Sequence, residues 1–244
     1  MMAQHPTPKE AGSAALTQSL LRAEQLDTDL MDALGAANYR PCDDSPRISA
    51  SVSAASVSLE HGRALRVLVA EGLATAGLSL LRLQHEALTR SVWLLYAADE
   101  PAIAKLSAPL SKEAEAAANK LPMMADMLKQ LAGKPAATQP LLGLLAFKDN
   151  NSAALNSFVH GGIHALQRHA QGFPLPLVLQ AIRNCNGLML MTGMMLAVLA
   201  GSQPLVGRVG RLQAAFADDL PPPPPMPGRD ATAPTPQDPK NPRS

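Results

Sequence analysis

Three of the six histidines lie in one short stretch, residues 157–169, which reads SFVHGGIHALQRH. His160 and His164 are four residues apart, so in a continuous helix they would share one face and could bind one metal ion. Gly161 and Gly162 separate them, and two glycines inside a helix cost about 2 kcal/mol relative to alanines. We therefore expect a kink or a new helix start at the glycine pair. The histidines are then hydrogen-bonded structural groups, metal ligands or members of a polar pocket.

A set of charged residues occupies the segment RLQHEALTR, residues 82–90. Arg82, Glu86 and Arg90 are spaced by four and share one helix face. Because the flanking segments are apolar, we expect this face to be buried, where charges must be paired. Glu86 neutralises only one arginine, so the other needs an acidic partner or an anion. The segment is consistent with a buried salt-bridge network, an anion pocket lined by Arg82 and Arg90, or an exposed face.

Motifs for established chemistries are absent. His85 and Glu86 begin a zinc-protease HExxH motif, but Thr89 stands where its second histidine should be. His61 lies on a core-facing stripe and is a candidate third ligand for His160 and His164, although the spacing alone does not establish a metal site. The chain also lacks GxSxG, P-loop and GxGxxG motifs. We expect neither a bound metal nor a cofactor.

The composition predicts the elements that position these residues. The chain has 244 residues, is 47% hydrophobic and only 3% aromatic, and its apolar residues are mainly Ala, Leu and Met, which favour helices. The expected fold class is all-α, a single multi-helix bundle. Net charge is +1, and residues 1–219 carry equal numbers of basic and acidic residues, so the chain lacks the basic footprint of a protein that binds duplex DNA.

Hydrophobic periodicity places the helices along the chain. The expected ranges are 13–35, 50–71, 74–98, a short helix after 99–101, then 111–119, 122–132, 140–148, 151–170, 174–201 and 204–218, with a loop over 133–140. The short link at Gly72 predicts an antiparallel pair of helices. The bundle domain is expected over 13–219, between a disordered N-terminus over 1–12 and a disordered tail over 220–244.

Two apolar or proline-rich segments bear on localisation and partners. The unbroken apolar run within 187–200 is about 20 Å long as a helix, too short for the roughly 30 Å of hydrocarbon in a membrane. We interpret it as a buried core helix, and expect no membrane association. Ten prolines lie between Pro221 and the C-terminus, so this segment is either a solvated tail or a docking strip for a proline-recognising partner. Cys42 and Cys185 match no metal spacing, and with no signal peptide we expect a cytoplasmic protein.

Three blocks of the sequence resemble a known family. They are SLEHGRALRVLVAEGLATAGLSLLRLQHEALTRSVWLLYAADE, ALNSFVHGGIHALQRH and NGLMLMTGMMLAVL. They are similar to an uncharacterised, mainly proteobacterial family of helical proteins, a domain of unknown function, over roughly residues 15–205. The resemblance implies a bacterial helical domain and brings no activity. More distantly, arginine- and histidine-bearing bundles resemble the HEPN superfamily of RNA-cleaving proteins. However, no arginine here precedes a histidine by the five to seven residues of the HEPN signature.

These observations lead to one main hypothesis and two alternatives. We expect a non-enzymatic helical bundle that self-associates and binds a small anionic ligand or a protein partner. The predicted pocket is buried and polar, and consists of His61, Arg82, Glu86, Arg90, His160 and His164. The first alternative is a HEPN-like nuclease or other hydrolase that uses Arg90 and His160. The second is a histidine-ligated metalloprotein.

Overall fold

Helices account for most of the described structure, as the composition predicts. The computed structural model describes residues 8–35 and 38–223, and within them there is no strand. The helices are α1 (Pro8–Leu34), α2 (Pro46–Ala70), α3 (Ala74–Tyr96), α4 (Glu100–Ser107), α5 (Lys112–Ala118), α6 (Met124–Ala132), α7 (Thr138–Val159), α8 (Ile163–Gln171), α9 (Leu175–Leu199) and α10 (Gln203–Ala215), with 3-10 turns η2 (Pro135–Ala137) and η3 (Ala217–Asp219).

Local signals explain where several helices begin. Ser45 precedes α2, and its side chain accepts a hydrogen bond from the backbone N–H of Ile48. Asp99 does the same for α4 through the N–H of Ala102. Each cap is followed by a proline in the first turn, where the missing N–H costs nothing. Asp99 therefore fixes the point at which the chain leaves α3 and enters the short helices α4 to α6.

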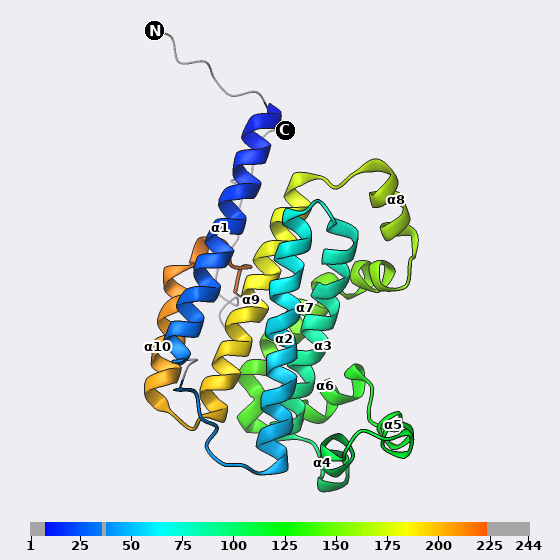
Figure 1. Cartoon of the computed structure of the whole chain (residues 1–244), viewed down its shortest axis with the longest axis vertical. Helices are drawn as coiled ribbons and strands as arrows, with labels where there is room; N and C mark the ends of the chain where they lie inside the picture. Colours follow the sequence, from blue (N-terminus) through cyan, green and yellow to red (C-terminus); the bar gives the residue numbers. More distant parts are fainter. Residues whose placement is uncertain (1–7, 36–37, 224–244) are drawn as a thin grey trace, which may run out of the picture.

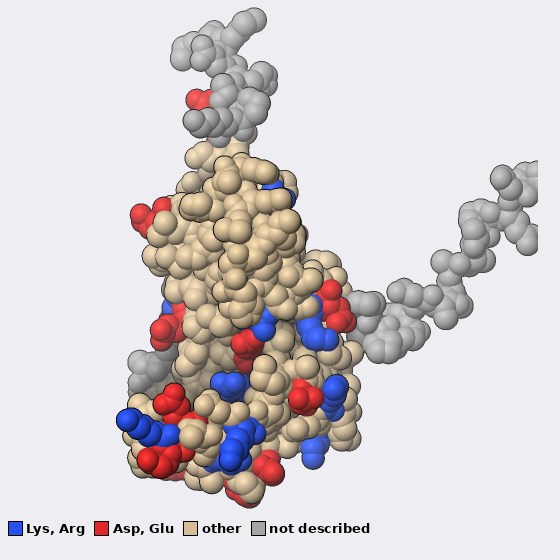
Figure 2. Space-filling view, turned by 90° about the vertical axis from the view of Figure 1, so that its right-hand side faces the viewer, with Lys and Arg blue, Asp and Glu red and all other residues tan. Residues whose placement is uncertain are grey.

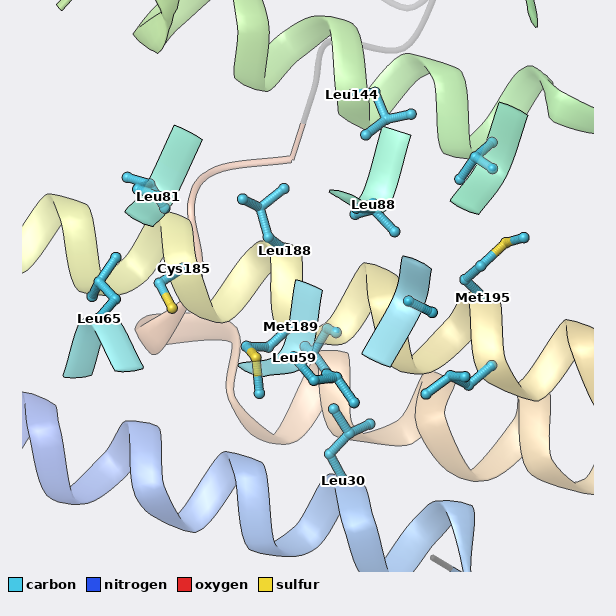
Figure 3. Close-up of a cluster of buried hydrophobic side chains, with 14 of the residues drawn as sticks. Leu30, Leu59, Leu65, Leu81, Leu88, Leu144, Cys185, Leu188, Met189 and Met195 are labelled. Atoms are coloured by element: carbon cyan, nitrogen blue, oxygen red, sulfur yellow. The ribbon is translucent and has the colours of Figure 1, made fainter. Parts of the chain in front are cut away.

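The long helices surround α9, which lies at the centre of the bundle (Figure 1). The α2–α3 pair is the predicted antiparallel hairpin, and α2, α3, α1 and α10 all contact α9. By length and composition α9 could cross a membrane, but 72% of its most apolar window is buried inside the protein. It is the expected core helix: Leu188, Met189 and Met195 pack among leucines of the neighbouring helices (Figure 3).

Most predicted helices are present, and the differences lie at their boundaries. The helix α2 begins at Pro46, before the predicted start at 50. The helix α1 begins at Pro8, before the predicted start at 13. The predicted loop over 133–140 is shorter, because α7 already begins at Thr138. The predicted separate helices over 140–148 and 151–170 are wrong: α7 runs unbroken through Asp149 to Val159, and α8 starts at Ile163. The break falls at the glycine pair, as expected.

Candidate functional site

The predicted charged set on α3 forms one ion pair. Arg82 Nε donates to Glu86 Oε1 over 2.8 Å, and the two side chains are only 22% and 33% exposed. Arg90, in contrast, is exposed. The buried face of α3 carries Leu81, His85 and Leu88 instead. The spacing of four correctly predicts a shared face, but that face lies at the edge of the bundle, so the excess positive charge is solvated and needs no buried counterion.

The histidines of the glycine-rich stretch belong to two different segments. His160 ends α7 and is exposed, and Gly161 then adopts a left-handed φ of +63° that reverses the chain. His164 lies in the first turn of α8, where its backbone N–H donates to Ser157 Oγ over 2.9 Å, and its side chain is exposed too. The expected burial is therefore wrong for both histidines, as it is for Arg90. The pair of turns at the glycines separates the two imidazoles and leaves them in water.

The two alternatives based on these histidines gain no geometric support. Over residues 8–35 and 38–223, no three His, Cys, Asp or Glu side chains are grouped to hold a metal. For the nuclease alternative, α7 runs antiparallel to α3, and His85 of α3 meets Leu144 of α7. Because the helices are antiparallel, Arg90 lies beyond His85 towards one end of the bundle, and His160 lies beyond Leu144 towards the other end. Counted along the two helices at 1.5 Å per residue, Arg90 and His160 are roughly 30 Å apart. His61, on α2, is half-buried.

The histidine that the fold does bury is His85, which the sequence analysis considered only as part of a failed zinc motif. Its side chain is 2% exposed. It stacks on Phe147 with ring centroids 4.5 Å apart, and its Nε2 lies 3.1 Å from the carbonyl oxygen of Leu144. Because a carbonyl only accepts, Nε2 carries the proton in the neutral ring. Burial lowers the pKa of His85 from 6.5 to about 4, and the nearby Arg82 adds to this. His85 is thus a neutral packing group between α3 and α7.

A partly buried ion-pair cluster joins α1 to α2. Asp27 accepts from Arg63 Nε over 2.8 Å and from Arg66 Nη2 over 2.9 Å. Arg66 also donates to the carbonyl oxygen of Ala23 over 2.6 Å and is only 9% exposed. Because Arg66 is nearly buried and holds both Asp27 and the Ala23 carbonyl oxygen of α1, the cluster positions α1 against α2.

A polar cavity of about 440 Å³ lies where α4, α5 and α6 meet the C-terminal end of α3. Its walls come from five short segments of chain. The lining residues are Trp93, Ala97, Asp99, Ala102, Lys105, Lys120, Leu121, Pro122, Gln130 and Lys134, and we call this cavity the Trp93 pocket. Trp93 is 2% exposed, and its indole N–H donates to Gln130 Oε1 over 2.7 Å, which fixes the ring at the base of the pocket.

The charges of the Trp93 pocket are unbalanced. Lys105 lies in the last turn of α4, Lys120 follows α5, and Lys134 follows α6. In the described part of the chain, none of the three has a carboxylate within salt-bridge distance. The single carboxylate in the lining, Asp99, accepts the capping bond of α4. Three ammonium groups thus share one cavity with one already engaged acid. Figure 2 shows that charged side chains of both signs gather on the lower part of this side of the molecule.

A comparison with protein-family models identifies the family. A model described as a family of unknown function, DUF6988, matches residues 55–222. The chain belongs to DUF6988. The matched range includes the whole lining of the Trp93 pocket and α8, but leaves out α1 and the Asp27 side of the ion-pair cluster. No curated protein matches the chain, and no solved structure does so. Membership of DUF6988 confirms the predicted family of unknown function with a helical fold.

The sequence analysis proposes none of the Trp93 pocket residues as a site residue, and it uses Asp99 only to place the start of a short helix. Lys105, Lys120 and Lys134 are spaced by about fifteen residues and follow no motif. The only available signal is positional, since each lies at or just beyond the end of a short helix, where lysines also stabilise the helix by themselves. Their convergence comes from the path of α4 to α6, which short-range patterns do not encode.

Proposed function

We propose that this DUF6988 protein is a non-enzymatic binding module for a small phosphorylated molecule, and that the Trp93 pocket is its site. The observation that carries the proposal is the presence of three lysines without acidic partners around one cavity. An ammonium group is a strong donor to phosphate oxygens, and a phosphate would supply the negative charge that the lining lacks.

The size and chemistry of the lining support a small organic phosphate. A volume of about 440 Å³ lies in the range of small-molecule sites, roughly 300–1,000 Å³, and is larger than a phosphate group needs. Leu121, Pro122 and Ala97 line the same cavity and are partly exposed, so they provide apolar contact for the remainder of the ligand. We therefore expect the anionic end to bind the lysines and the organic part to pack against these three residues.

The lining also favours binding over catalysis. It contains no histidine, cysteine, serine, threonine or tyrosine, and its one carboxylate caps α4. Of the side chains that carry out general acid–base or nucleophilic chemistry, only the three lysines are therefore free in the lining, and we assign them to recognition of the anion. The six residues predicted from the sequence provide no better site, because Arg90, His160 and His164 are exposed.

Calorimetric titration with inorganic pyrophosphate and with ADP, at low ionic strength, tests the proposal. The test variant is Lys120→Ala with Lys134→Ala. The control, Lys112→Ala with Lys129→Ala, removes the same charge from exposed positions of α5 and α6 outside the lining. We expect at least one probe to bind the wild type and the control alike, and the test variant about tenfold more weakly or worse, a difference of about 1.4 kcal/mol. Binding of neither probe, or equal weakening in the two variants, would overturn the proposal.

A further inference from the structure

The short segment between α4 and α6, residues 109–123, is a separate unit of the fold, and we call it the α5 strap. Pro109 follows α4 and Pro122 precedes α6, and a proline prevents a helix from running on through it. The helix within the strap, α5, is rich in alanine, and Ser111 caps its first turn by accepting from the N–H of Ala114. Local signals thus define the strap, and Figure 1 shows α5 at the edge of the molecule, outside α4 and α6.

Few contacts tie the strap to the remainder of the protein. No residue of α5 is buried, and α5 packs mainly on α4. Wherever the structure describes the chain, the side chains of the strap make no ion pair and no hydrogen bond with residues outside it. Outside the strap, its backbone is hydrogen-bonded only through Met123, whose carbonyl oxygen accepts from the first turn of α6. A segment with so few ties opens at a small cost in free energy.

The strap also forms one wall of the Trp93 pocket. Lys120, Leu121 and Pro122 belong to the strap, whereas Lys105 lies on α4 and Lys134 follows α6. Leu121 is half-buried against the core, and Lys120 is exposed. The pocket therefore combines a firmly packed base with a weakly held wall, and that wall carries one of the three ammonium groups.

The charges of the lining couple the strap to an anion in the pocket. Without an anion, Lys105 and Lys134 repel Lys120, and this repulsion opposes any movement of the strap towards them. A phosphate bound among the three ammonium groups reverses the sign of that interaction. A ligand shifts a conformational equilibrium only when it binds one state better than the other. Here the closed state gains a contact between Lys120 and the phosphate that an open strap lacks.

We propose that the α5 strap is a lid that closes over the anion bound in the Trp93 pocket, and that Lys120 is the residue that draws it in. The inference rests on the proposed function and adds a conformational change to it. Leu121 and Pro122 move with Lys120, so closure brings their apolar groups onto the organic part of the ligand. The closed strap also excludes water from the phosphate, and the ligand leaves when the strap opens.

Hydrogen–deuterium exchange of the full chain, read by mass spectrometry of its peptides, measures the closure. The probe is pyrophosphate or ADP, whichever binds in the calorimetric titration. At saturating probe we expect the amides of α5, Lys112–Ala118, to exchange about tenfold more slowly, and those of α10, Gln203–Ala215, to exchange as before. No residue of α5 lines the pocket, so slower exchange there reports closure of the strap and not direct cover by the ligand.

Two variants of the strap separate a lid from a fixed wall, each compared at a probe concentration that its own titration shows to be saturating. Lys120→Ala should bind probe without slowing exchange in α5. Lys112→Ala removes the same charge from the strap outside the lining, and should behave as the wild type. Unchanged exchange of α5 in saturated wild type, or equal slowing in Lys120→Ala, would overturn the lid and leave the proposed function standing. Binding of neither probe would overturn both.

Discussion

Acidification should destabilise this protein through one buried side chain, His85. Its pKa is lowered from 6.5 to about 4, first by burial and then by nearby positive charge. A histidine with a lowered pKa in the folded state is neutral there, whereas in the unfolded chain it takes up a proton as the pH falls below about 6.5. The contribution of His85 to stability is therefore fully present above the unfolded pKa, and it is lost as the pH falls from about 6.5 towards 4.

The size of the effect follows from the two pKa values. Between about pH 7 and about pH 4.5, proton uptake by the unfolded chain alone lowers the free energy of unfolding by about 2.5 kcal/mol. Exposed carboxylates titrate near the lower end of this interval too, so a variant is needed to isolate the histidine. His85→Gln has an amide that can donate to the Leu144 carbonyl oxygen in place of Nε2, but it does not titrate.

Urea unfolding followed by circular dichroism, at a series of pH values, measures the difference. His85→Gln is expected to be less stable than the wild type at neutral pH, because it loses the stacking on Phe147. Its stability should then fall less steeply with acid, by about 2 kcal/mol over the interval. Parallel pH profiles for the two proteins would show that His85 is not held neutral, and would refute the assignment of its burial as the cause.

Three further predictions concern packing and charge. Asp27→Asn should lower the free energy of unfolding by about 3 kcal/mol, measured by urea unfolding, because it leaves the nearly buried Arg66 without its counterion; a loss below about 0.5 kcal/mol would show an ordinary surface pair. Gly62→Ala should cost about 1–3 kcal/mol, since the added Cβ lies 2.5 Å from Met189 Sδ. The matched change Gly210→Ala, also helical but with no atom within 4 Å, should raise the melting temperature slightly. Equal effects at the two glycines would contradict the packing described here.

The helices were largely predictable because the signals that set them are local. The range predicted for α3, 74–98, nearly coincides with Ala74–Tyr96, since its apolar run is unbroken and Gly72 precedes it. The glycine pair at 161–162 marks a chain break for the same reason: a positive φ at Gly161 is accessible chiefly to glycine. The continuity of α7 was missed, because Asp149 and Asn150 are weak helix formers whose preference is overridden by the packing of the helix on α3.

The candidate site was less predictable, for two physical reasons. Periodicity indicates which residues share a helix face, but not which face meets the core when apolar residues are found all around, as on α3. The face of Arg82 and Glu86 was expected inside, and the face of His85 is inside instead. The Trp93 pocket depends on where three short helices lie in space, and lysines as far apart as Lys105 and Lys134 share no pattern that could reveal it.

The most direct test of the central claim uses the only tryptophan in the chain, Trp93, which lies at the base of the proposed site. Titrations with pyrophosphate and with ADP, with fluorescence emission as the readout, should give a saturable change for at least one of the two probes in the wild type and in the Lys112→Ala, Lys129→Ala control. When Lys120 and Lys134 are replaced by alanine, the apparent affinity obtained from the same titration should fall to about one tenth of the wild-type value or less. An emission that responds to neither probe, or responds identically in all three proteins, would contradict anion binding in the Trp93 pocket.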